Sequence, residues 1–189
     1  NIANNMLGWE TTTSYNVGVD FGLFNNRIYL SADYYKKTTK DLLLKAPVSL
    51  ITGFANMMDN VGNVDNWGLE FELNTANITT NTFRWNSSLN ISLNRNKITS
   101  LGDDNSDIRS GQGNTIIQRV GNPINSYMLL RVDRTLRAAD FEADGVTPKP
   151  GIAIYTGQKP GDTKWVDVND DGKITSADYD VVGSYQPKF

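Results

Sequence analysis

The sequence contains no cysteine and no histidine among its 189 residues. Without cysteine the chain can form no disulfide and offers no thiol nucleophile. Without histidine it lacks the commonest general base and the commonest zinc ligand. These absences remove most of the side chains on which hydrolytic or redox catalysis depends, and we expect no enzymatic activity from this chain.

Long apolar runs and concentrated positive charge are missing as well. No apolar run approaches the roughly 20 residues that a membrane-spanning helix requires. The formal net charge is −3, and the lysines and arginines are scattered rather than gathered into a basic stripe, so nucleic acid is not an expected partner. The strands of a membrane β-barrel alternate apolar and polar residues, so none of these absences excludes such a barrel.

The strongest positive signal is an alternation with a period of two residues along residues 9–24. The odd positions are mostly apolar or aromatic and the even positions mostly polar, which is typical of a strand with two different faces. The run is about twice the usual five to six residues of a soluble strand, as a tilted strand crossing a bilayer requires. The residues at odd positions are Trp9, Thr11, Thr13, Tyr15, Val17, Val19, Phe21 and Leu23.

Two hairpins follow from the same pattern. The Asn25-Asn26 pair marks a tight turn, because asparagine tolerates positive φ angles, and residues 28–35 alternate again behind it. Residues 67–75 and 83–94 form a second alternating pair around a polar turn at residues 79–82. Aromatic side chains near the strand ends are typical of the girdles at a membrane interface. They are Trp67, Phe83 and Trp85.

The pattern predicts an all-β fold: a transmembrane antiparallel β-barrel segment of four long strands in two hairpins, with a long extracellular loop. Residues 1–100 would hold the hairpins and an outer loop at about residues 45–66, because short turns of such barrels face the periplasm. Residues 101–189 would form a large extracellular loop region that leads into the next strand. We expect minor strands at residues 124–132 and 152–155, and single helical turns at residues 39–44 and 175–180.

Several groups of residues carry a resemblance to a known family. Together they resemble the C-terminal part of SusC/RagA-type TonB-dependent transporters, in the expected order along nearly the whole chain. The matching groups are residues 9–20, residues 33–43, Asn60-Val61-Gly62, residues 66–70, residues 94–98, residues 120–124, residues 160–183 and Pro187-Lys188-Phe189.

The resemblance implies a 22-stranded barrel in the bacterial outer membrane of Bacteroidota. Such receptors import oligosaccharides or peptides, with a plug domain inside the barrel, a SusD-like surface lipoprotein outside it and energy delivered through TonB. Four strands alone would leave two open edges in lipid, so we expect this chain to work with the remainder of the barrel. It would be a part of a longer receptor or one polypeptide of a split receptor.

Residues 167–178 match the spacing of an EF-hand-like calcium loop. Side-chain oxygens fall at loop positions 1, 3 and 5, and Gly172 at position 6 permits the sharp turn. Ile174 at position 8 would pack inward, and Thr175 would be the N-cap of the helical turn at residues 175–180, with Asp178 at its third helical position. Aspartate replaces the usual glutamate at position 12, which shortens the reach of that ligand. The candidate ligands for a structural calcium ion are Asp167, Asn169, Asp171, Lys173 through its carbonyl, Thr175 and Asp178. The alternative is an Asx-rich turn held only by hydrogen bonds from the backbone.

The sequence leaves the roles of two groups of residues, and the class of the whole protein, open. Asp20, Glu70, Glu72 and Arg84 should face the lumen, where they either line the solute path or pair with the plug. Apolar residues within residues 46–58 either pack inside the loop or contact the lipoprotein. A soluble calcium-stabilised β-sandwich that binds carbohydrate is the main rival to the importer, and an outer-membrane enzyme or a passive pore is the third possibility.

Overall fold

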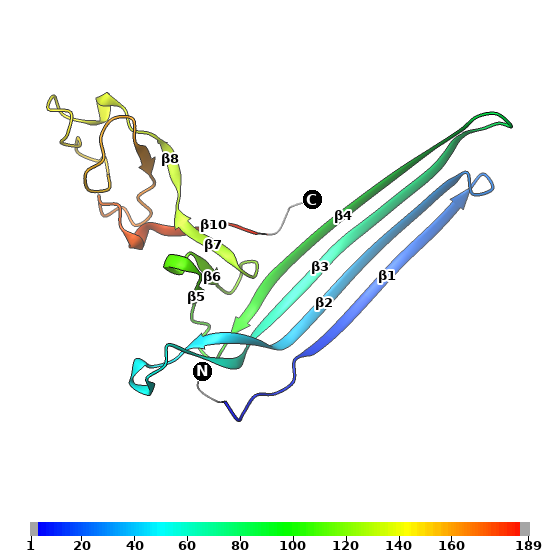
Figure 1. Ribbon diagram of the computed structural model, residues 1–189, viewed down its shortest axis with the longest axis horizontal. Coiled ribbons are helices and arrows are strands. Elements are labelled where there is room, and N and C mark those ends of the chain that lie inside the picture. The colour runs from blue at the N-terminus through cyan, green and yellow to red at the C-terminus, as the bar shows by residue number, and fades with distance from the viewer. Residues whose placement is uncertain (1–3, 186–189) are drawn as a thin grey trace. The chain divides into compact units, whose positions relative to one another are not determined.

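The computed structural model describes residues 4–185, so the match expected at Pro187-Lys188-Phe189 lies outside the described residues. The described residues form antiparallel strands and short 3-10 turns, without an α-helix (Figure 1). None of the described helical turns is long and apolar enough to cross a membrane. The chain divides into two compact units. The first contains residues up to Ile108 together with Gln118–Asn125, and the second contains Arg109–Ile117 and Ser126–Tyr185.

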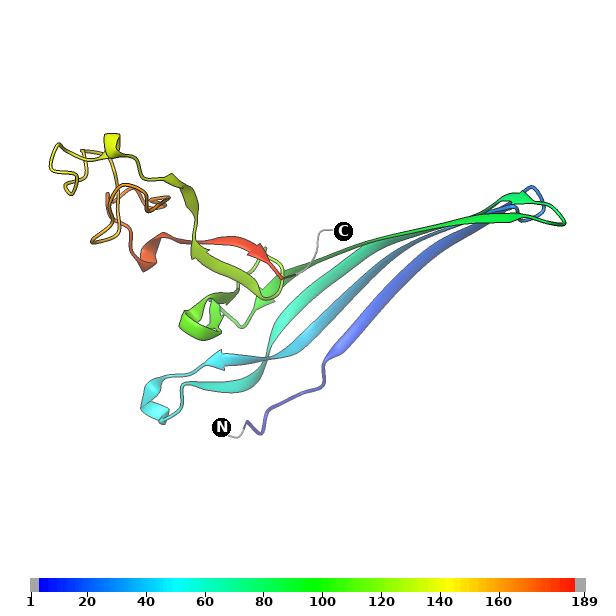
Figure 2. The same cartoon turned by 45° about the horizontal axis from the view of Figure 1, so that its top comes forward.

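The first unit is a sheet of four long strands in the order β1-β2-β3-β4. Each strand pairs with its chain neighbour in antiparallel orientation, so the two predicted hairpins are confirmed and β2 joins β3 to make one continuous sheet. The strands twist together along their length, as right-handed strand twist dictates (Figure 2). Their bounds are Thr11–Leu23 for β1, Ile28–Pro47 for β2, Asn56–Thr79 for β3 and Arg84–Leu101 for β4.

Both short turns lie where the sequence predicts them. Phe24, Asn25 and Asn26 adopt φ values of 52°, 55° and 62°, and the backbone N–H of Arg27 donates to the carbonyl of Phe24 over 3.3 Å. At the other turn the N–H of Thr80 donates to the carbonyl of Phe83 over 2.8 Å. The two turns lie at the same end of the sheet (Figure 1).

At the opposite end of the sheet, the segment predicted as an outer loop at about residues 45–66 consists largely of strand residues, because β2 runs to Pro47 and β3 begins at Asn56. One local prediction was wrong there, since residues 39–44 are strand rather than a helical turn. The cause is a bulge: the register of β2 against β3 shifts between Thr39 and Leu42, and Asp41 takes a positive φ of 59°. An extra residue breaks the two-residue alternation without ending the strand.

Side chains satisfy the backbone groups that this bulge leaves unpaired. The N–H of Asp41 donates to Oδ1 of Asn63 over 3.1 Å, and its carbonyl accepts from Nδ2 of Asn60 over 2.7 Å. Asn60 also pairs with Gly8 in both directions, at 2.8 and 3.1 Å. The N–H of Leu43 donates to the Glu10 carboxylate over 2.7 Å. These bonds hold the segment before β1 against the bulged strand.

A small apolar core lies at the same end of the first unit. It contains Val64, Ile98, Leu101 and Ile108, all at most 8% exposed. Partly buried apolar side chains from two directions complete it. Leu42, Leu44 and Val61 come from β2 and β3, and Val120 and Ile124 come from the returning segment Gln118–Asn125.

The second unit contains short strands in two small sheets, of which one has the order β10-β7-β6-β5 and the other pairs β8 with β9. The predicted strand at residues 124–132 corresponds to β7 and the start of β8, whereas residues 152–155 are not a strand and Ala153 is buried instead. The bounds are Ile108–Ser110 (β5), Ile116–Gln118 (β6), Ser126–Leu130 (β7), Val132–Thr135 (β8), Thr163–Trp165 (β9) and Tyr179–Ser184 (β10).

Candidate functional site: the two faces of the long sheet

One face of the four-stranded sheet is apolar across every strand. Residues that are directly paired across the strands point to the same side, so each row of the register belongs to one face. Most of these side chains are well exposed within the unit, for example 71% for Val17 and 53% for Leu69, and the others are half-buried. The three central rows are Phe21, Leu30, Leu73 and Leu89; Val19, Ala32, Phe71 and Ile91; and Val17, Tyr34, Leu69 and Leu93.

Aromatic and charged residues bound this apolar band at both ends. The next row toward the bulged end holds Tyr15, Lys36, Trp67 and Arg95. One row further, Asp65 forms an ion pair with Lys36 at 3.3 Å and accepts a hydrogen bond from Thr38 over 2.7 Å. Ion pairs and hydroxyls at this level indicate water, and aromatic and cationic side chains just before it are typical of an interface.

The opposite end has its own aromatic margin. Phe24 lies in the first turn, and Trp85 pairs with Ile78 next to Phe83 at the second turn. At about 3.3 Å per residue and a tilt of about 40°, the part of β3 between Trp67 and Ile78 rises by about 28 Å. That height is close to the apolar band of about 25 Å on outer-membrane barrels. The sheet therefore has the length and the margins that a lipid-facing wall requires.

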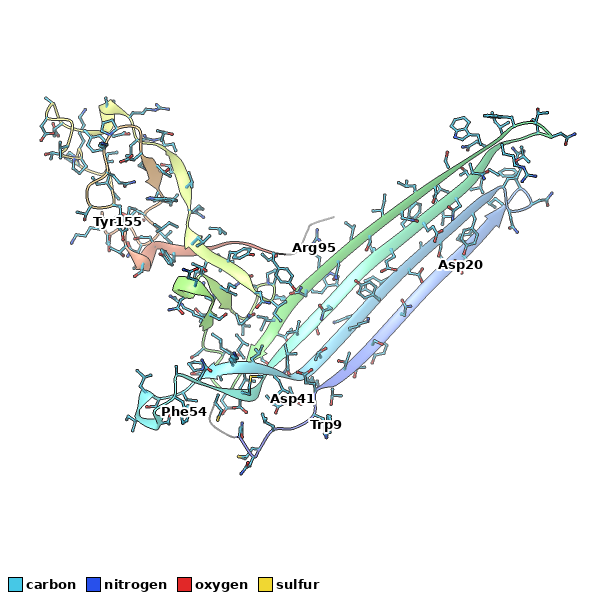
Figure 3. All side chains as sticks on the ribbon, viewed as in Figure 1. Trp9, Asp20, Asp41, Phe54, Arg95 and Tyr155 are labelled. Atoms are coloured by element: carbon cyan, nitrogen blue, oxygen red, sulfur yellow. The ribbon has the colours of Figure 1, made fainter. Side chains whose placement is uncertain are left out.

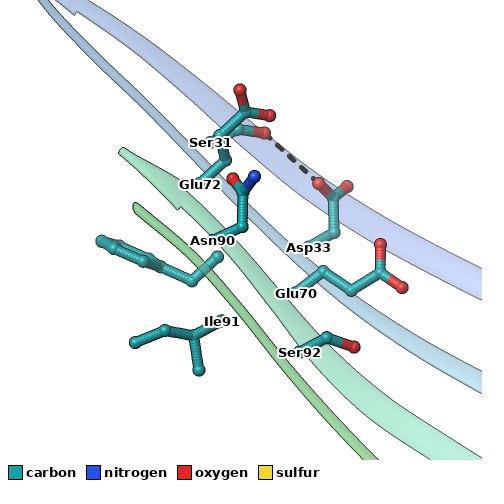
Figure 4. Close-up of a pocket in the computed structure, with 8 residues that line it drawn as sticks. Ser31, Asp33, Glu70, Glu72, Asn90, Ile91 and Ser92 are labelled. Atoms are coloured by element: carbon teal, nitrogen blue, oxygen red, sulfur yellow. Dashed lines mark hydrogen bonds between the residues drawn. The ribbon is translucent and has the colours of Figure 1, made fainter. Parts of the chain in front are cut away.

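The other face of the same strands is polar. Glu70 and Glu72 of β3 lie on it with Asp33 of β2 (Figure 4). Asp20 of β1 lies on the same face, so the carboxylates predicted to face the lumen share one side of the sheet. Arg84 occupies the same face at the margin near the second turn. The Tyr29 hydroxyl donates to Asp20 over 3.0 Å and the Ser31 hydroxyl to Asp33 over 3.3 Å.

Apart from Lys37, neutral side chains cover the rest of the polar face. β4 contributes a stripe of short amides and hydroxyls beside the carboxylates. Such groups donate and accept hydrogen bonds. The stripe consists of Asn86, Ser88, Asn90, Ser92 and Asn94. The face can therefore be wetted or can hydrogen-bond a polar solute.

The predicted calcium loop folds into a compact turn in the second unit. The Asp167 carboxylate accepts from the N–H groups of Asp171 and Gly172, over 3.2 and 2.8 Å. The Asn169 amide oxygen accepts from the same Asp171 N–H over 3.0 Å. Gly172 has a φ of 79°, and Ile174 is 5% exposed and packs inward as the spacing predicts. Loop positions 1, 3 and 5 are thus brought together around one turn.

Asp178, the expected ligand at position 12, is engaged differently. It is fully buried and caps the 3-10 turn Ser176–Asp178, as the capping pattern with Thr175 predicts. Its two oxygens accept from the N–H groups of Thr175 at 2.7 Å and Val168 at 3.0 Å. These backbone donors, the Thr175 N–H first, hold the pKa of Asp178 below its ordinary value.

Carboxylates alone are not placed to hold a metal in this loop. In residues 4–185, no three aspartate, glutamate, histidine or cysteine side chains gather closely enough for that. A calcium ion here would depend on Asn169 and on the carbonyl of Lys173 in addition to the carboxylates, which is how EF-hand-like loops mix their ligands.

Sequence reasoning missed the residues that hold the bulge, above all Asn60. The Asn60-Val61-Gly62 group stands out in the sequence only for its family resemblance. The signal that could have revealed its role is the asparagine at residue 63, because Asn60 and Asn63 lie close together in β3, opposite an unexplained break in the alternation of β2. Short amide side chains are frequent where a strand needs a substitute for a backbone partner.

An antiparallel sheet with an apolar outer face, aromatic margins and a polar inner face defines a class of protein: the wall of an outer-membrane β-barrel. Residues 1–188 match the family model described as TonB dependent receptor-like, beta-barrel, so the chain belongs to that family. Its members are transporters of the outer membrane and not enzymes. This confirms the predicted fold class and location.

Individual relatives agree with the family. The chain is 34% identical to TonB-dependent receptor P3 of Formosa agariphila over 99% of its own length and 19% of that receptor. It is 35% identical to TonB-dependent receptor SusC of Bacteroides thetaiotaomicron over 93% of its own length and 17% of SusC. The chain therefore spans less than a fifth of the length of these relatives.

Solved structures show the same fold. A structure of the RagAB peptide transporter matches 73% of this chain and 15% of its own chain, with 29% identity and a TM-score of 0.64. A structure of the RagAB peptide importer in its closed-closed state matches 100% of this chain and 19% of its own, with 22% identity and a TM-score of 0.72. The resemblance to SusC/RagA transporters drawn from short motifs is confirmed.

Proposed function

We propose that this chain forms part of the wall of a TonB-dependent outer-membrane importer for large nutrients, either oligosaccharides or peptides. The observation that carries the proposal is the two-faced sheet: Leu69 and Phe71 point to one side and Glu70 and Glu72 to the other, over a height that matches a membrane. A wall of this kind separates lipid from a polar passage.

The partners follow from the same proposal. The four strands need the remainder of the barrel to pair their edges, and the polar face needs a plug or a solute column beside it. A SusD-like surface lipoprotein, TonB and a Bacteroidota host complete the set of expected partners and source, by analogy with the SusC relative and the RagAB structures. The apolar tip between β2 and β3, with Leu50, Ile51 and Phe54 exposed, is a candidate contact for the lipoprotein (Figure 3).

Uptake by whole cells tests the importer. Cells that produce the complete receptor with its lipoprotein are given fluorescent oligosaccharides or fluorescent peptides, and the same cells without the receptor serve as the control. We expect one of the two substrate classes to accumulate only in cells with the receptor, and accumulation to stop when an uncoupler removes the energy supply. No accumulation of either class would contradict import, and accumulation that survives the uncoupler would indicate a passive pore.

The soluble β-sandwich is less well supported than the barrel wall. A sandwich needs a second sheet against the apolar face, about 10 Å away. Within the first unit no such sheet is present among the described residues, and Val17, Leu69 and Leu89 remain about half exposed or more.

We also propose that the turn at residues 167–178 binds a structural calcium ion that stiffens the second unit. The support is the spacing of Asp167, Asn169 and Asp171 around one turn with Gly172 at its tip. An ion that binds only the folded turn would stabilise it by mass action. The capping role of Asp178 limits how freely that carboxylate can turn toward the ion.

Protease protection of the complete receptor tests the ion. We expect about 1 mM Ca²⁺ to slow cleavage near residues 160–180 and a chelator to reverse the effect. Asp171→Asn keeps an oxygen for the Lys173 N–H but removes the charge, so it should abolish the effect of Ca²⁺ without unfolding the turn. Glu142→Gln, at an exposed residue of the same unit, is the matched control. Equal cleavage with and without Ca²⁺ would contradict the calcium site and would indicate a turn that is held by hydrogen bonds alone.

A further inference from the structure

The outer edge of β4 has two parts. Along one part the backbone N–H and C=O groups have no partner among the described residues, and at the other part they are already hydrogen-bonded. β4 is an outer strand of its sheet, since β3 is the one strand of the described residues that pairs with it there. Ile98 on this strand directs both its backbone groups away from β3, because its N–H donates to the carbonyl of Asn122 and its carbonyl accepts from the N–H of Gly121, each over 2.9 Å.

The orientation at Ile98 fixes the orientation of the residues before it. In an antiparallel pair, backbone groups alternate between facing the partner strand and facing away. The register between Val64↔Ile98 and Ala76↔Asn86 has no shift, so every second residue of β4 points its N–H and C=O to the open edge. The residues concerned are Asn86, Ser88, Asn90, Ser92, Asn94 and Asn96. The first five make no backbone hydrogen bond on this side to another described residue.

At Ile98 the edge is already occupied. The chain makes a turn in which the N–H of Asn122 donates to the carbonyl of Arg119 over 3.1 Å and Gly121 has a φ of 90°. We call residues 119–122 the edge cap. Its Gly121 and Asn122 pair with Ile98 as a neighbouring strand would, so no further strand can hydrogen-bond to Ile98 while the cap is in place.

Three further contacts hold the edge cap. The Arg119 guanidinium donates to the Asp107 carboxylate from Nε over 3.0 Å and from Nη2 over 2.7 Å. The Asn96 side chain accepts from the N–H of Ile124 over 2.8 Å. Val120 and Ile124 pack against the core that contains Ile98. A turn fixed by a bidentate ion pair and by apolar packing is not easily displaced.

A closed barrel requires a neighbouring strand along the open edge of β4, because unpaired backbone groups at the level of the apolar band cannot remain open to lipid. We infer that the edge cap ends this pairing before Ile98. The partner is an antiparallel strand of the complete receptor, and none of the described strands takes this place. The cap thereby determines how far along β4 the two strands can pair.

Hydrogen exchange of the complete receptor, in detergent or in lipid discs, tests whether the edge of β4 is paired along residues 85–95 and capped at Ile98. We expect the peptide covering residues 85–95 to exchange slowly. Arg119→Gln should speed exchange around Ile98 several-fold and leave residues 85–95 unchanged. Arg109→Gln, which replaces an exposed arginine, is the matched control. Fast exchange along residues 85–95, or exchange around Ile98 that ignores Arg119→Gln in a folded receptor, would overturn the inference.

A structure of the complete wild-type receptor decides the same point without a variant. The expected result is a strand beside β4 whose hydrogen bonds stop before Ile98, with Gly121 and Asn122 still paired to Ile98. A neighbouring strand that continues past Ile98 and displaces the cap would overturn the inference and leave nutrient import untouched. A β4 edge that remains unpaired would overturn the inference and would also contradict the barrel wall on which the proposed function rests.

Discussion

The Asn60 side chain hydrogen-bonds backbone N–H and C=O groups, which elsewhere in the sheet pair with the backbone of a neighbouring strand. Its amide accepts from Gly8 and donates to the carbonyls of Gly8 and Asp41. A carboxylate in its place would keep the acceptor but turn two donors into acceptors facing carbonyl oxygens. The identity of one side chain thus decides whether the bulge at Asp41 is satisfied.

Asn60→Asp should therefore loosen the segment before β1. Losing two donated hydrogen bonds costs about 1–3 kcal/mol, which corresponds to about 5- to 150-fold faster exchange of the Gly8 amide in the complete receptor. Hydrogen exchange on the peptide covering residues 4–12 measures it. Asn81→Asp, in the exposed turn between β3 and β4, is the matched control. An unchanged Gly8 amide would show that the Asn60 side chain does not hold this segment.

Asp140 is a second residue on which local order depends. Its carboxylate accepts from both terminal nitrogens of Arg134, at 2.6 and 2.7 Å, and from the N–H of Arg137 at 2.7 Å. The Arg134 guanidinium first and the Arg137 N–H second hold the pKa of Asp140 well below its ordinary value. The charged form is thus the one that the fold favours.

The sign of the pH effect follows from that lowered pKa. Asp140 stabilises the second unit fully above its unfolded pKa of about 3.9 and progressively less as the pH falls toward its folded pKa. We expect protease resistance of residues 131–165 to be constant from pH 7 to about 5 and to decline below about 4. Asp140→Asn should lower resistance already at pH 7, and Asp103→Asn, at an exposed carboxylate, should not. Equal resistance of both variants at pH 7 would contradict this role.

At the scale of the strand, the two faces should respond oppositely to the same substitution. Ile91 lies in the middle row of the apolar band and Ser92 beside it on the polar face. Arginine at the centre of a lipid-facing strand costs about 2–4 kcal/mol, so Ile91→Arg should reduce the amount of folded receptor in outer membranes. Ser92→Arg should leave it near the wild-type amount. Gel mobility before and after heating measures the folded fraction, and equal losses in both variants would count against a lipid-facing band.

The sequence predicted these strands well where lipid and lumen enforce alternation, and poorly beyond the band. Between Tyr15 and Leu23 every side chain must suit one of two media, so the pattern is regular. Past Trp67 and Lys36 both faces meet water or local packing, and the bulge at Asp41 shifts the register. The alternation disappears there although the strands continue.

In the calcium loop, too, the sequence predicted the features that depend on nearby residues and not those that depend on distant ones. The spacing predicted the turn, the inward Ile174 and the cap at Thr175, because each depends on neighbours within a few residues. The engagement of Asp178 with the Val168 N–H closes the loop across ten residues. The edge cap could not be predicted from the sequence either, since the pairing of Ile98 with Asn122 depends on how distant segments pack.

At the scale of the whole molecule, the chain is one part of a larger wall. In the part of the chain that the structure describes, no further strand pairs with β1 or with β4 in this sheet, and the chain's relatives are more than five times longer. The four strands do not close a barrel by themselves, but the sheet already has an apolar and a polar face, because apolar and polar residues alternate along each strand. A barrel wall requires that these two sides meet different media.

Spin labels on neighbouring residues of β3 measure that difference directly. The chain has no cysteine, so Phe71→Cys and Glu72→Cys each add one labelling site to it in the assembled receptor. We predict that the label at residue 71 collides mainly with oxygen dissolved in lipid and the label at residue 72 relatively more with a water-soluble nickel chelate. A label at residue 71 that the nickel chelate reaches freely, or that protein shields from both reagents, would contradict a lipid-facing wall.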